Sequence, residues 1–299
     1  ADLWTPNFNV PMQDSLLWVY EGQTQFWGNV LAARSGLRPL AASRDALALV
    51  AATYADNRAG LQWRGIQDTT NDPIVVGRAS RAYLNYQMSE DYYRGGQMIW
   101  WEADALIRTK SGGRKSLDDF ASAFFGVNDG EWKVQNTYTF EDVVKTLNGV
   151  QPHDWTTFLR DRLDGKVALT GGVEASGWKL VYKDEPNAYA KASSRGGGAD
   201  YTYSLGLSLN KEGVIGDVRW DSPAFKAGIG SGSTVVAVNG LAYDKDVLDE
   251  AVTAAKTGAP IELMLRDFDI YRTIRLDYRG GLRYPHLERI AGKPDYLTP

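Results

Sequence analysis

The spacing of apolar residues changes once along the chain, near Gly165. Before this point, apolar positions recur at helical spacing between capping and turn residues, so we expect a helical first half. From Trp178 onward the period shortens to two, which is typical of strands that bury one face. The pattern therefore predicts an α+β protein of more than one domain, with an all-α half followed by a β-domain.

Capping residues and glycines set the expected helix boundaries. Ser116 and Thr139 each lie three residues before an aspartate, which is the spacing of a capping box with Asp in place of the usual Glu. Gly36 and Gly60 are expected to close the first two helices, because glycine tolerates the left-handed conformation found there. The expected helices lie over residues 14–36, 43–60 and 92–110, and begin at Ser116, Thr139 and Asp154.

The second half contains short alternating runs and one helical run. The expected strands lie over residues 178–182, 201–209, 214–220, 234–238, 261–268 and 271–278, with a helix over 247–256. Serine and glycine residues gather over residues 190–200, where we expect a mobile loop. These signals divide the chain into a helical part (1–165), a connecting strand and mobile loop (166–199), a β-domain (200–278) and an irregular tail (279–299).

Composition narrows the possible partners. The 299 residues suffice for about two cores, and a net charge of −4 with a pI near 5.4 favours neither nucleic acid nor an anionic membrane. The chain has no cysteine, so it has no disulfide and no thiol ligand or nucleophile, and its compartment stays undecided. No apolar run approaches the length of a membrane span.

Glu21 is the main candidate for chemistry in the first half. It lies in the otherwise apolar and aromatic run of residues 16–22, where an ionised carboxylate needs a cation, hydrogen-bond donors or a metal unless it reaches water. Arg34 is more than three turns away on the same expected helix, and the histidines, His153 and His286, are isolated from each other and from Glu21. Glu21 is therefore either bent out to solvent or held by a positive group.

An ordered series of turns in the second half resembles a PDZ domain of the bacterial protease-associated type. The series contains Leu-Gly-Leu at 205–207, Asp-Ser-Pro-Ala at 221–224 and Asn-Gly at 239–240, and it covers residues 200–278. Singly these residues form turns, but together they indicate this domain. The resemblance implies that an extended peptide adds a strand beside the sheet edge, and that backbone amides at 205–207 bind its terminal carboxylate. The implied peptide-binding residues, facing the 247–256 helix, are Ser204, Leu205, Gly206, Leu207, Ser208 and Leu209.

The sequence around Glu21 resembles the glycyl aminopeptidase family, which are zinc metallopeptidases of the gluzincin type. Residues 17–24 match the helix that supplies a glutamate as third zinc ligand in an aromatic, Glu, Gly context. The resemblance implies that Glu21 binds zinc, beside two histidines from a His-Glu-x-x-His helix. That motif is absent from these residues. We expect the chain to be the carboxy-terminal piece of such a peptidase rather than a degenerate relative, and to bind zinc weakly and be inactive by itself.

The same resemblance implies a tyrosine that donates its hydroxyl to the oxyanion of the tetrahedral intermediate. In gluzincins this tyrosine lies three residues before a glycine at a helix start, and Tyr93 and Tyr92 both have this spacing. We favour Tyr93, because Asp104 then takes the place of an acidic residue further along the helix. One turn after Glu21, Thr24 and Gln25 could bond to the ligand shell, although a solvated Gln is the commoner outcome.

Three classes of function are compatible with these observations. The leading hypothesis is part of a zinc aminopeptidase that cleaves peptides, with a PDZ domain that binds peptide segments. The alternative is a PDZ-containing peptide-binding protein without chemistry. A carbohydrate-active enzyme would need two facing acids at a cleft, and the PDZ series disfavours it.

Overall fold

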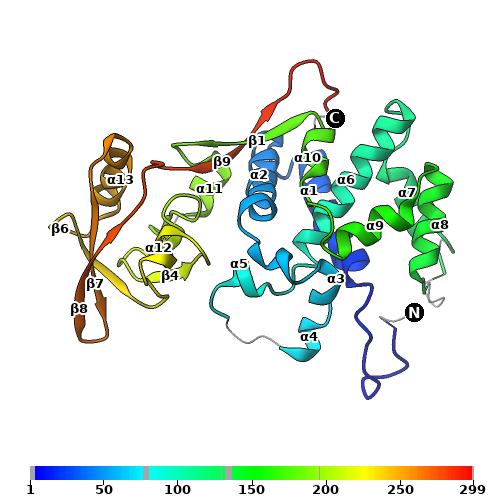
Figure 1. Ribbon diagram of the computed structural model, residues 1–299. Coiled ribbons are helices and arrows are strands. Elements are labelled where there is room, and N and C mark those ends of the chain that lie inside the picture. Colours follow the sequence, from blue (N-terminus) through cyan, green and yellow to red (C-terminus); the bar gives the residue numbers. More distant parts are fainter. Residues whose placement is uncertain (1–3, 77–80, 129, 132–136, 195, 298–299) are drawn as a thin grey trace.

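The computed structural model describes residues 4–76, 81–128, 130–131, 137–194 and 196–297. Helices form one end of the molecule, and the strands of a smaller β-domain lie at the other end (Figure 1). The mixed fold, with a helical part followed by a β-part, is confirmed. Among the described helices, none has the length and apolar character that crossing a bilayer requires.

The helical part is built around two 18-residue helices, α1 and α6. Shorter helices surround them and complete a core of aromatic and aliphatic side chains. The helices of this part are α1 (Leu17–Arg34), α2 (Leu40–Asp56), α3 (Ile66–Thr69), α4 (Asp72–Val75), α5 (Leu84–Gln87), α6 (Arg94–Ser111), α7 (Leu117–Phe125), α8 (Phe140–Val150), α9 (Trp155–Leu163) and α10 (Gly171–Ala175), with a 3-10 helix at Ala59–Gln62.

The observed starts of the expected helices lie within three residues of the expected positions. Both capping boxes form, at Ser116 with its third residue Asp119 and at Thr139 with Asp142. Helix α2 begins at Leu40 rather than at Ser43. Pro39 takes the N-cap position, and its carbonyl accepts the first helical hydrogen bond from the Ser43 amide at 3.0 Å. A proline tolerates this position because it lacks only an amide that a helix start leaves free.

Helices α1 and α6 approach each other closely at two glycines. A Cβ atom added to Gly22 would lie 2.9 Å from the Gly96 backbone, and one added to Gly96 would lie 2.9 Å from the Gly22 Cα. The indole of Trp100 donates to the Trp18 carbonyl at 3.0 Å beside this crossing. The crossing fixes the residues that flank the glycines, and these include the candidates Glu21 and Tyr93.

The β-part contains two small sheets packed around one core. Strands β2, β3 and β4 form a three-stranded sheet, and the order of the other is β6-β5-β7-β8. Helix α13 covers this core through Leu248 and Val252. The elements are β2 (Ala199–Asp200), β3 (Leu207–Leu209), β4 (Ile215–Val218), α12 (Pro223–Lys226), β5 (Thr234–Val238), β6 (Leu241–Ala242), α13 (Lys245–Ala254), a 3-10 helix at Ala255–Thr257, β7 (Ile261–Asp267) and β8 (Ile270–Leu276).

Two segments expected to be irregular have regular structure, so those expectations are wrong. The tail contains strand β9 (Tyr284–Arg289), which pairs antiparallel with β1 (Trp178–Lys183) at the helical end (Figure 1). The serine- and glycine-rich segment contains helix α11 (Ala188–Ser193), which the Asn187 side chain caps by accepting from the Ala190 amide. The amide group of Asn187 also donates to the Pro285 carbonyl at 3.1 Å, so β9 and α11 support each other.

The helical part and the β-part are joined at helix α5. The side chain of Asn85, which is 3% exposed, accepts a hydrogen bond from the Trp220 amide at 2.8 Å and donates to the Trp220 carbonyl at 3.4 Å. The indole of Trp220 stacks on Tyr86 with ring centroids 4.4 Å apart.

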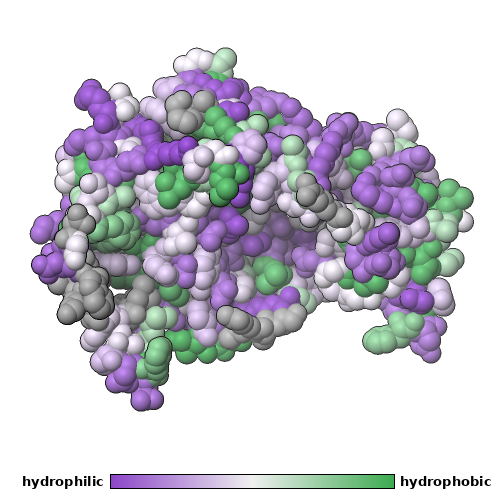
Figure 2. Space-filling model, turned by 180° about the vertical axis from the view of Figure 1, so that it is seen from behind, coloured by the Kyte–Doolittle hydropathy of each residue, from purple (hydrophilic) through white to green (hydrophobic). Residues whose placement is uncertain are grey.

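Seen from behind, the surface is mainly polar with scattered apolar patches and is hollowed near its middle (Figure 2).

Candidate functional site

Glu21 and Tyr93 meet across the crossing of α1 and α6. The Tyr93 hydroxyl donates a hydrogen bond to Glu21 Oε1 at 2.8 Å, and both side chains are partly buried. The partner of the carboxylate is therefore a phenol, 72 residues away in the sequence. The sequence places these two residues in one candidate site through the family resemblance, and the structure brings them together.

The environment keeps the Tyr93 phenol protonated at neutral pH. Burial is the main cause that raises the pKa of Tyr93 to about 12, and the hydrogen bond to the Glu21 carboxylate contributes to this rise. A negative charge on the phenol would be poorly solvated and would face the carboxylate. Tyr93 is thus a stable hydrogen-bond donor.

Tyr92 lies in a different environment. Its side chain is 2% exposed and belongs to the helical core, and its backbone amide donates to the Thr69 hydroxyl at 3.1 Å. The two tyrosine rings are 4.8 Å apart, so Tyr92 supports the ring of Tyr93 from the side. Burial also raises the pKa of Tyr92. Of the two candidates, Tyr93 is the one whose hydroxyl contacts Glu21.

A buried network that the sequence reasoning missed holds the turn before α6. Asp91 is 5% exposed, and its Oδ1 accepts from the Tyr54 hydroxyl at 2.7 Å and from Arg58 Nε at 2.6 Å. Its Oδ2 accepts from the Ser89 amide at 3.0 Å. The network anchors the chain two residues before Tyr93. The sequence shows an aspartate before two tyrosines, but its side-chain partners Tyr54 and Arg58 lie more than 30 residues upstream.

The remaining candidates in the first half lie outside the Glu21 contact. The Thr24 hydroxyl donates to the Tyr20 carbonyl of its own helix at 2.8 Å. Gln25 lines a polar cavity of about 440 Å³. Asp104 is bonded to Arg108 at 2.7 Å and to the Leu117 amide at 2.9 Å, so it anchors the start of α7. A bond from Thr24 or Gln25 to the carboxylate stays a prediction.

A polar cavity of about 440 Å³ lies beside the site. Thr24 and Gln25, one turn beyond Glu21 on α1, form one wall. Its other lining residues include Arg38, Arg58 and Arg94, and none of its lining residues is a carboxylate. Arg94 directly follows Tyr93 and bonds to the Gln97 side chain at 3.1 Å. The cavity is thus lined by positively charged groups, and it includes Thr24 and Arg94, which lie close in sequence to Glu21 and Tyr93.

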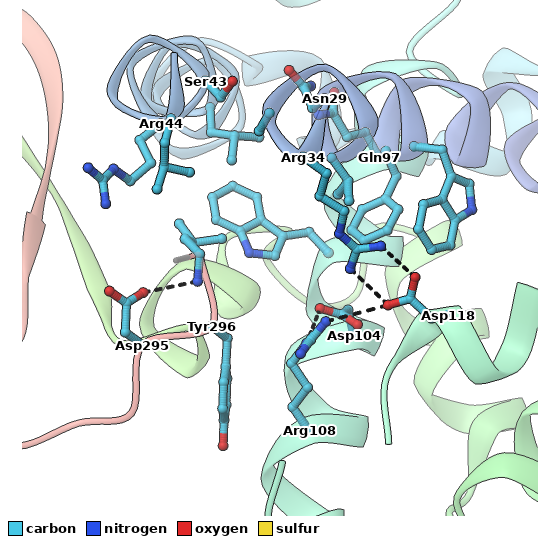
Figure 3. A pocket seen from close by; sticks show the side chains of 18 residues that line it. Asn29, Arg34, Ser43, Arg44, Gln97, Asp104, Arg108, Asp118, Asp295 and Tyr296 are labelled. Atoms are coloured by element: carbon cyan, nitrogen blue, oxygen red, sulfur yellow. Dashed lines mark hydrogen bonds and ion pairs between the residues drawn. The ribbon is translucent and has the colours of Figure 1, made fainter. Parts of the chain in front are cut away.

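A second cavity, of about 260 Å³, lies between α1, α2, α6 and the segment at 295–297 (Figure 3). Four of the charged side chains drawn there form ion pairs. Arg34 forms two hydrogen bonds with Asp118, at 2.6 and 2.8 Å, and Arg108 binds Asp104 at 2.7 Å. Its charged side chains therefore stabilise the junction of α1 with α6 and α7.

The carboxylate of Glu21 does not by itself fit a zinc site. Structural and catalytic zinc sites use at least three protein ligands. Within the described ranges, no group of three or more His, Asp or Glu side chains could hold a metal ion. His153 packs against Trp155 with ring centroids 5.3 Å apart, and His286 Nε2 bonds to the Glu185 carbonyl at 2.7 Å. Neither histidine is shown in contact with Glu21.

The PDZ-like part has the turn expected at 204–209. Gly206 has a φ of +82°, and a Cβ there would lie 2.0 Å from the Ser222 Cβ, so only glycine fits. The Arg219 amide donates to the Gly206 carbonyl at 2.8 Å, and the Ala224 amide donates to the Leu205 carbonyl at 2.9 Å. Leu205, Leu207 and Leu209 are buried, and Ser208 is partly exposed. These contacts fix the turn against α12.

In this structure the chain's own backbone pairs with the turn and strand at 204–209, and peptide binding there stays a prediction. Both edges of β3 are paired, one with β4 and one with β2. The amides of Ser204 and Gly206 donate to the Tyr201 carbonyl, at 3.0 and 2.8 Å. The strand pairs with its own chain because the Tyr201 backbone turns back beside it, a contact that alternation alone could not reveal.

Comparisons with known proteins agree with the family resemblance. Residues 1–99 match the family model of M61 glycyl aminopeptidase. A crystal structure of an aminopeptidase N family protein from Idiomarina loihiensis superposes with a TM-score of 0.67 and 18% identity, over 95% of this chain and 49% of that one. This chain therefore spans about half the length of that protein.

A second structure is the HtrA3 PDZ domain bound to a phage-derived ligand, with 20% identity over 39% of this chain and 96% of that one. Its TM-score of 0.19 is too low to carry an argument. No curated protein matches the chain. The chain has the fold of the aminopeptidase N family protein, and over residues 1–99 it is similar to the M61 glycyl aminopeptidases, which confirms the family resemblance inferred from its sequence.

Proposed function

We propose that this chain forms the carboxy-terminal part of a zinc-dependent aminopeptidase, with Glu21 as one zinc ligand and Tyr93 as the donor to the substrate oxyanion. The observation that carries the proposal is the 2.8 Å contact between the two side chains, inside the segment that matches the glycyl aminopeptidase family. Two further zinc ligands would come from a His-Glu-x-x-His helix, a motif absent from these 299 residues. The chain by itself would be inactive.

Tyr93 has the properties that an oxyanion donor needs. Its phenol stays protonated because burial raises its pKa to about 12, and a protonated donor next to developing negative charge stabilises a transition state. One hydroxyl donates one hydrogen bond at a time, so Tyr93 would leave Glu21 when it bonds to a substrate carbonyl. The cavity lined by Thr24 and Arg94 offers space for a peptide on this side of the pair.

The test uses the longer protein that contains the His-Glu-x-x-His helix. Glu21→Gln should lower zinc content after dialysis, because an amide is a weaker zinc ligand than a carboxylate. Tyr93→Phe should keep zinc bound and lower kcat by about 10²-fold or more, the effect of losing one oxyanion donor. Tyr92→Phe, in the adjacent ring, is the matched control and should leave kcat within a few-fold.

Two results would contradict the proposal. Full zinc content in Glu21→Gln would remove Glu21 from the metal site. A kcat of Tyr93→Phe equal to that of Tyr92→Phe would remove the oxyanion role.

The alternative is a non-catalytic peptide-binding protein with a PDZ-like domain. One observation favours it: the hydrogen bond from the Tyr93 hydroxyl to Glu21 Oε1 joins α1 to α6, which is a structural role in itself. Under this alternative the pair only fastens α1 to α6. The Glu21→Gln variant would then lower the free energy of unfolding without changing zinc content, which separates the two functions.

A further inference from the structure

The edge of β3 that faces α13 carries a strand from the same chain. Strand β2 runs antiparallel to β3, with Ala199 opposite Leu209 and Asp200 opposite Ser208. The Tyr201 amide continues this ladder by donating to the Leu207 carbonyl at 2.9 Å. A peptide added to a sheet edge would make these same backbone hydrogen bonds.

The end of this segment occupies the turn at 204–206. The Tyr201 carbonyl oxygen accepts from the amides of Ser204 and Gly206. Converging amides of this kind bind a terminal carboxylate in domains that recognise chain ends. The carbonyl of Tyr201 therefore lies where one oxygen of such a carboxylate would be held.

The side chain of Tyr201 fills the space between β3 and α13. It is 1% exposed and belongs to the same buried cluster as Leu207 and Leu248. Its hydroxyl donates to Asp249 Oδ1 on α13 at 2.7 Å. Asp249 is partly exposed and also pairs with Lys245 Nζ. Its carboxylate favours a tyrosine over a phenylalanine in this space, because a phenylalanine would leave Asp249 without the hydrogen bond from the hydroxyl.

We infer that the groove between β3 and α13 is a binding site for peptides that end in tyrosine, and that residues 199–201 fill it as an intramolecular ligand. The inference rests on the peptide binding that the leading hypothesis assigns to the PDZ-like part beside the aminopeptidase activity. It goes beyond that peptide binding in two ways: it names tyrosine as the preferred terminal residue of the peptide, and it names residues 199–201 as the internal segment that an incoming peptide must displace.

The surroundings of β2 allow it to leave the groove. The strand is two residues long, and three glycines at 196–198 precede it. A glycine run is flexible, so β2 can detach without moving α11. A groove that is open only part of the time binds an external peptide more weakly, in proportion to the open fraction. Weakening the internal segment should therefore strengthen external binding.

The experiment measures fluorescence polarisation of a labelled peptide with the sequence of residues 197–201 and a free carboxylate, titrated with the full chain. Tyr201→Phe keeps the ring in the core and removes the hydroxyl that bonds to Asp249. It should bind the peptide about ten-fold more tightly than the unmodified chain, since losing a hydrogen bond to a charged group weakens the internal ligand by about that factor. Tyr243→Phe, whose ring packs against the same core, is the matched control and should change nothing.

Two changes of the peptide test the specificity. A peptide ending in phenylalanine should bind about ten-fold more weakly than the one ending in tyrosine, and Asp249→Ala should abolish this difference. A peptide amidated at its terminus should bind more weakly, because it presents no carboxylate to the amides of Ser204 and Gly206. Saturating peptide should also increase hydrogen exchange at the Tyr201 amide of the unmodified chain and leave Leu209 protected.

The outcomes separate this inference from peptide binding in general and from the proposed zinc site. Equal affinity for Tyr201→Phe and Tyr243→Phe, with no preference between the two peptides, would overturn the inference and leave peptide binding standing. If no variant binds any peptide, and circular dichroism shows that each variant is folded, both the inference and peptide binding by the β-part are overturned. Strand β2 would then be a permanent part of the sheet. Neither result bears on Glu21, which zinc content tests independently.

Discussion

At the scale of single residues, the contact between Glu21 and Tyr93 predicts how the tyrosine titrates. Burial is the main cause of its raised pKa, and the Glu21 carboxylate adds to it. Glu21→Gln should therefore lower the pKa of Tyr93 from about 12 without restoring the ordinary value of 10.0. Nuclear magnetic resonance of ring-labelled tyrosine over alkaline pH checks this, with Tyr93→Phe to assign the signal.

Tyr203 is the control for this titration. Burial raises its pKa to about 12 as well, and Glu21 is not among the causes. Its signal should titrate alike in both proteins. If the Tyr93 pKa in Glu21→Gln equals that in the unmodified chain, the hydrogen bond between the two side chains does not persist in solution.

The same pKa shift has a consequence for stability at high pH. The pKa of Tyr93 is higher in the folded chain than the value of 10.0 expected when it is unfolded, so above that pH the unfolded state loses its proton first. The contribution of Tyr93 is complete below pH 10 and is lost as pH rises towards 12. Denaturant unfolding over this range should show a shallower loss in Tyr93→Phe than in the unmodified chain. Identical pH dependence in the two would contradict this account.

At the scale of helices and strands, the crossing of α1 and α6 holds the site together. Gly22→Ala would place a Cβ 2.9 Å from the Gly96 backbone, which cannot yield as a side chain can. We expect a loss of about 1–3 kcal/mol in the free energy of unfolding, the usual cost of overpacking, and a separation of Glu21 from Tyr93. Denaturant unfolding measures the first, and the alkaline titration of Tyr93 measures the second.

Gly28 on the same helix is the matched control for this substitution. A Cβ added there meets nothing within 4 Å. Gly28→Ala should raise the free energy of unfolding by up to about 1 kcal/mol, because alanine is the better helix former. A Gly22→Ala protein as stable as the unmodified chain would show that the helices separate without cost, and that the crossing does not position the site.

The sequence predicts local features of these elements well and distant contacts poorly. Capping boxes such as that of Ser116 depend on residues three apart, so they can be read directly from the sequence. The pairing of β1 with β9 joins Trp178 to Arg289, more than 100 residues apart, and no local pattern marks it. The Tyr93 phenol that bonds to Glu21 lies 72 residues away, so no local pattern marks this contact either. Glu21 and Tyr93 were nevertheless both chosen, because the family resemblance extends over both segments.

At the scale of the whole molecule, the side chain of Asn85 on helix α5 is one of the contacts that join the helical part to the β-part. Asn85 is buried and bonds to both backbone groups of Trp220. Asn85→Ala would leave the amide and carbonyl of Trp220 without these partners, at a cost of about 1–3 kcal/mol. We expect the single unfolding transition of a coupled molecule to separate into two, with the β-part unfolding on its own.

The variant Gln87→Ala tests whether this effect belongs to the contact rather than to the helix. Gln87 is an exposed residue of the same helix, and its side chain bonds only to the Ala82 carbonyl at 2.8 Å among the contacts that the structure describes. Its removal should change the free energy of unfolding by no more than about 0.5 kcal/mol. Calorimetry of both variants measures the number of unfolding transitions and their temperatures. If Asn85→Ala unfolds in one transition at the temperature of Gln87→Ala, the stacked rings of Tyr86 and Trp220 suffice to couple the two parts, and the position of the PDZ-like part does not depend on Asn85.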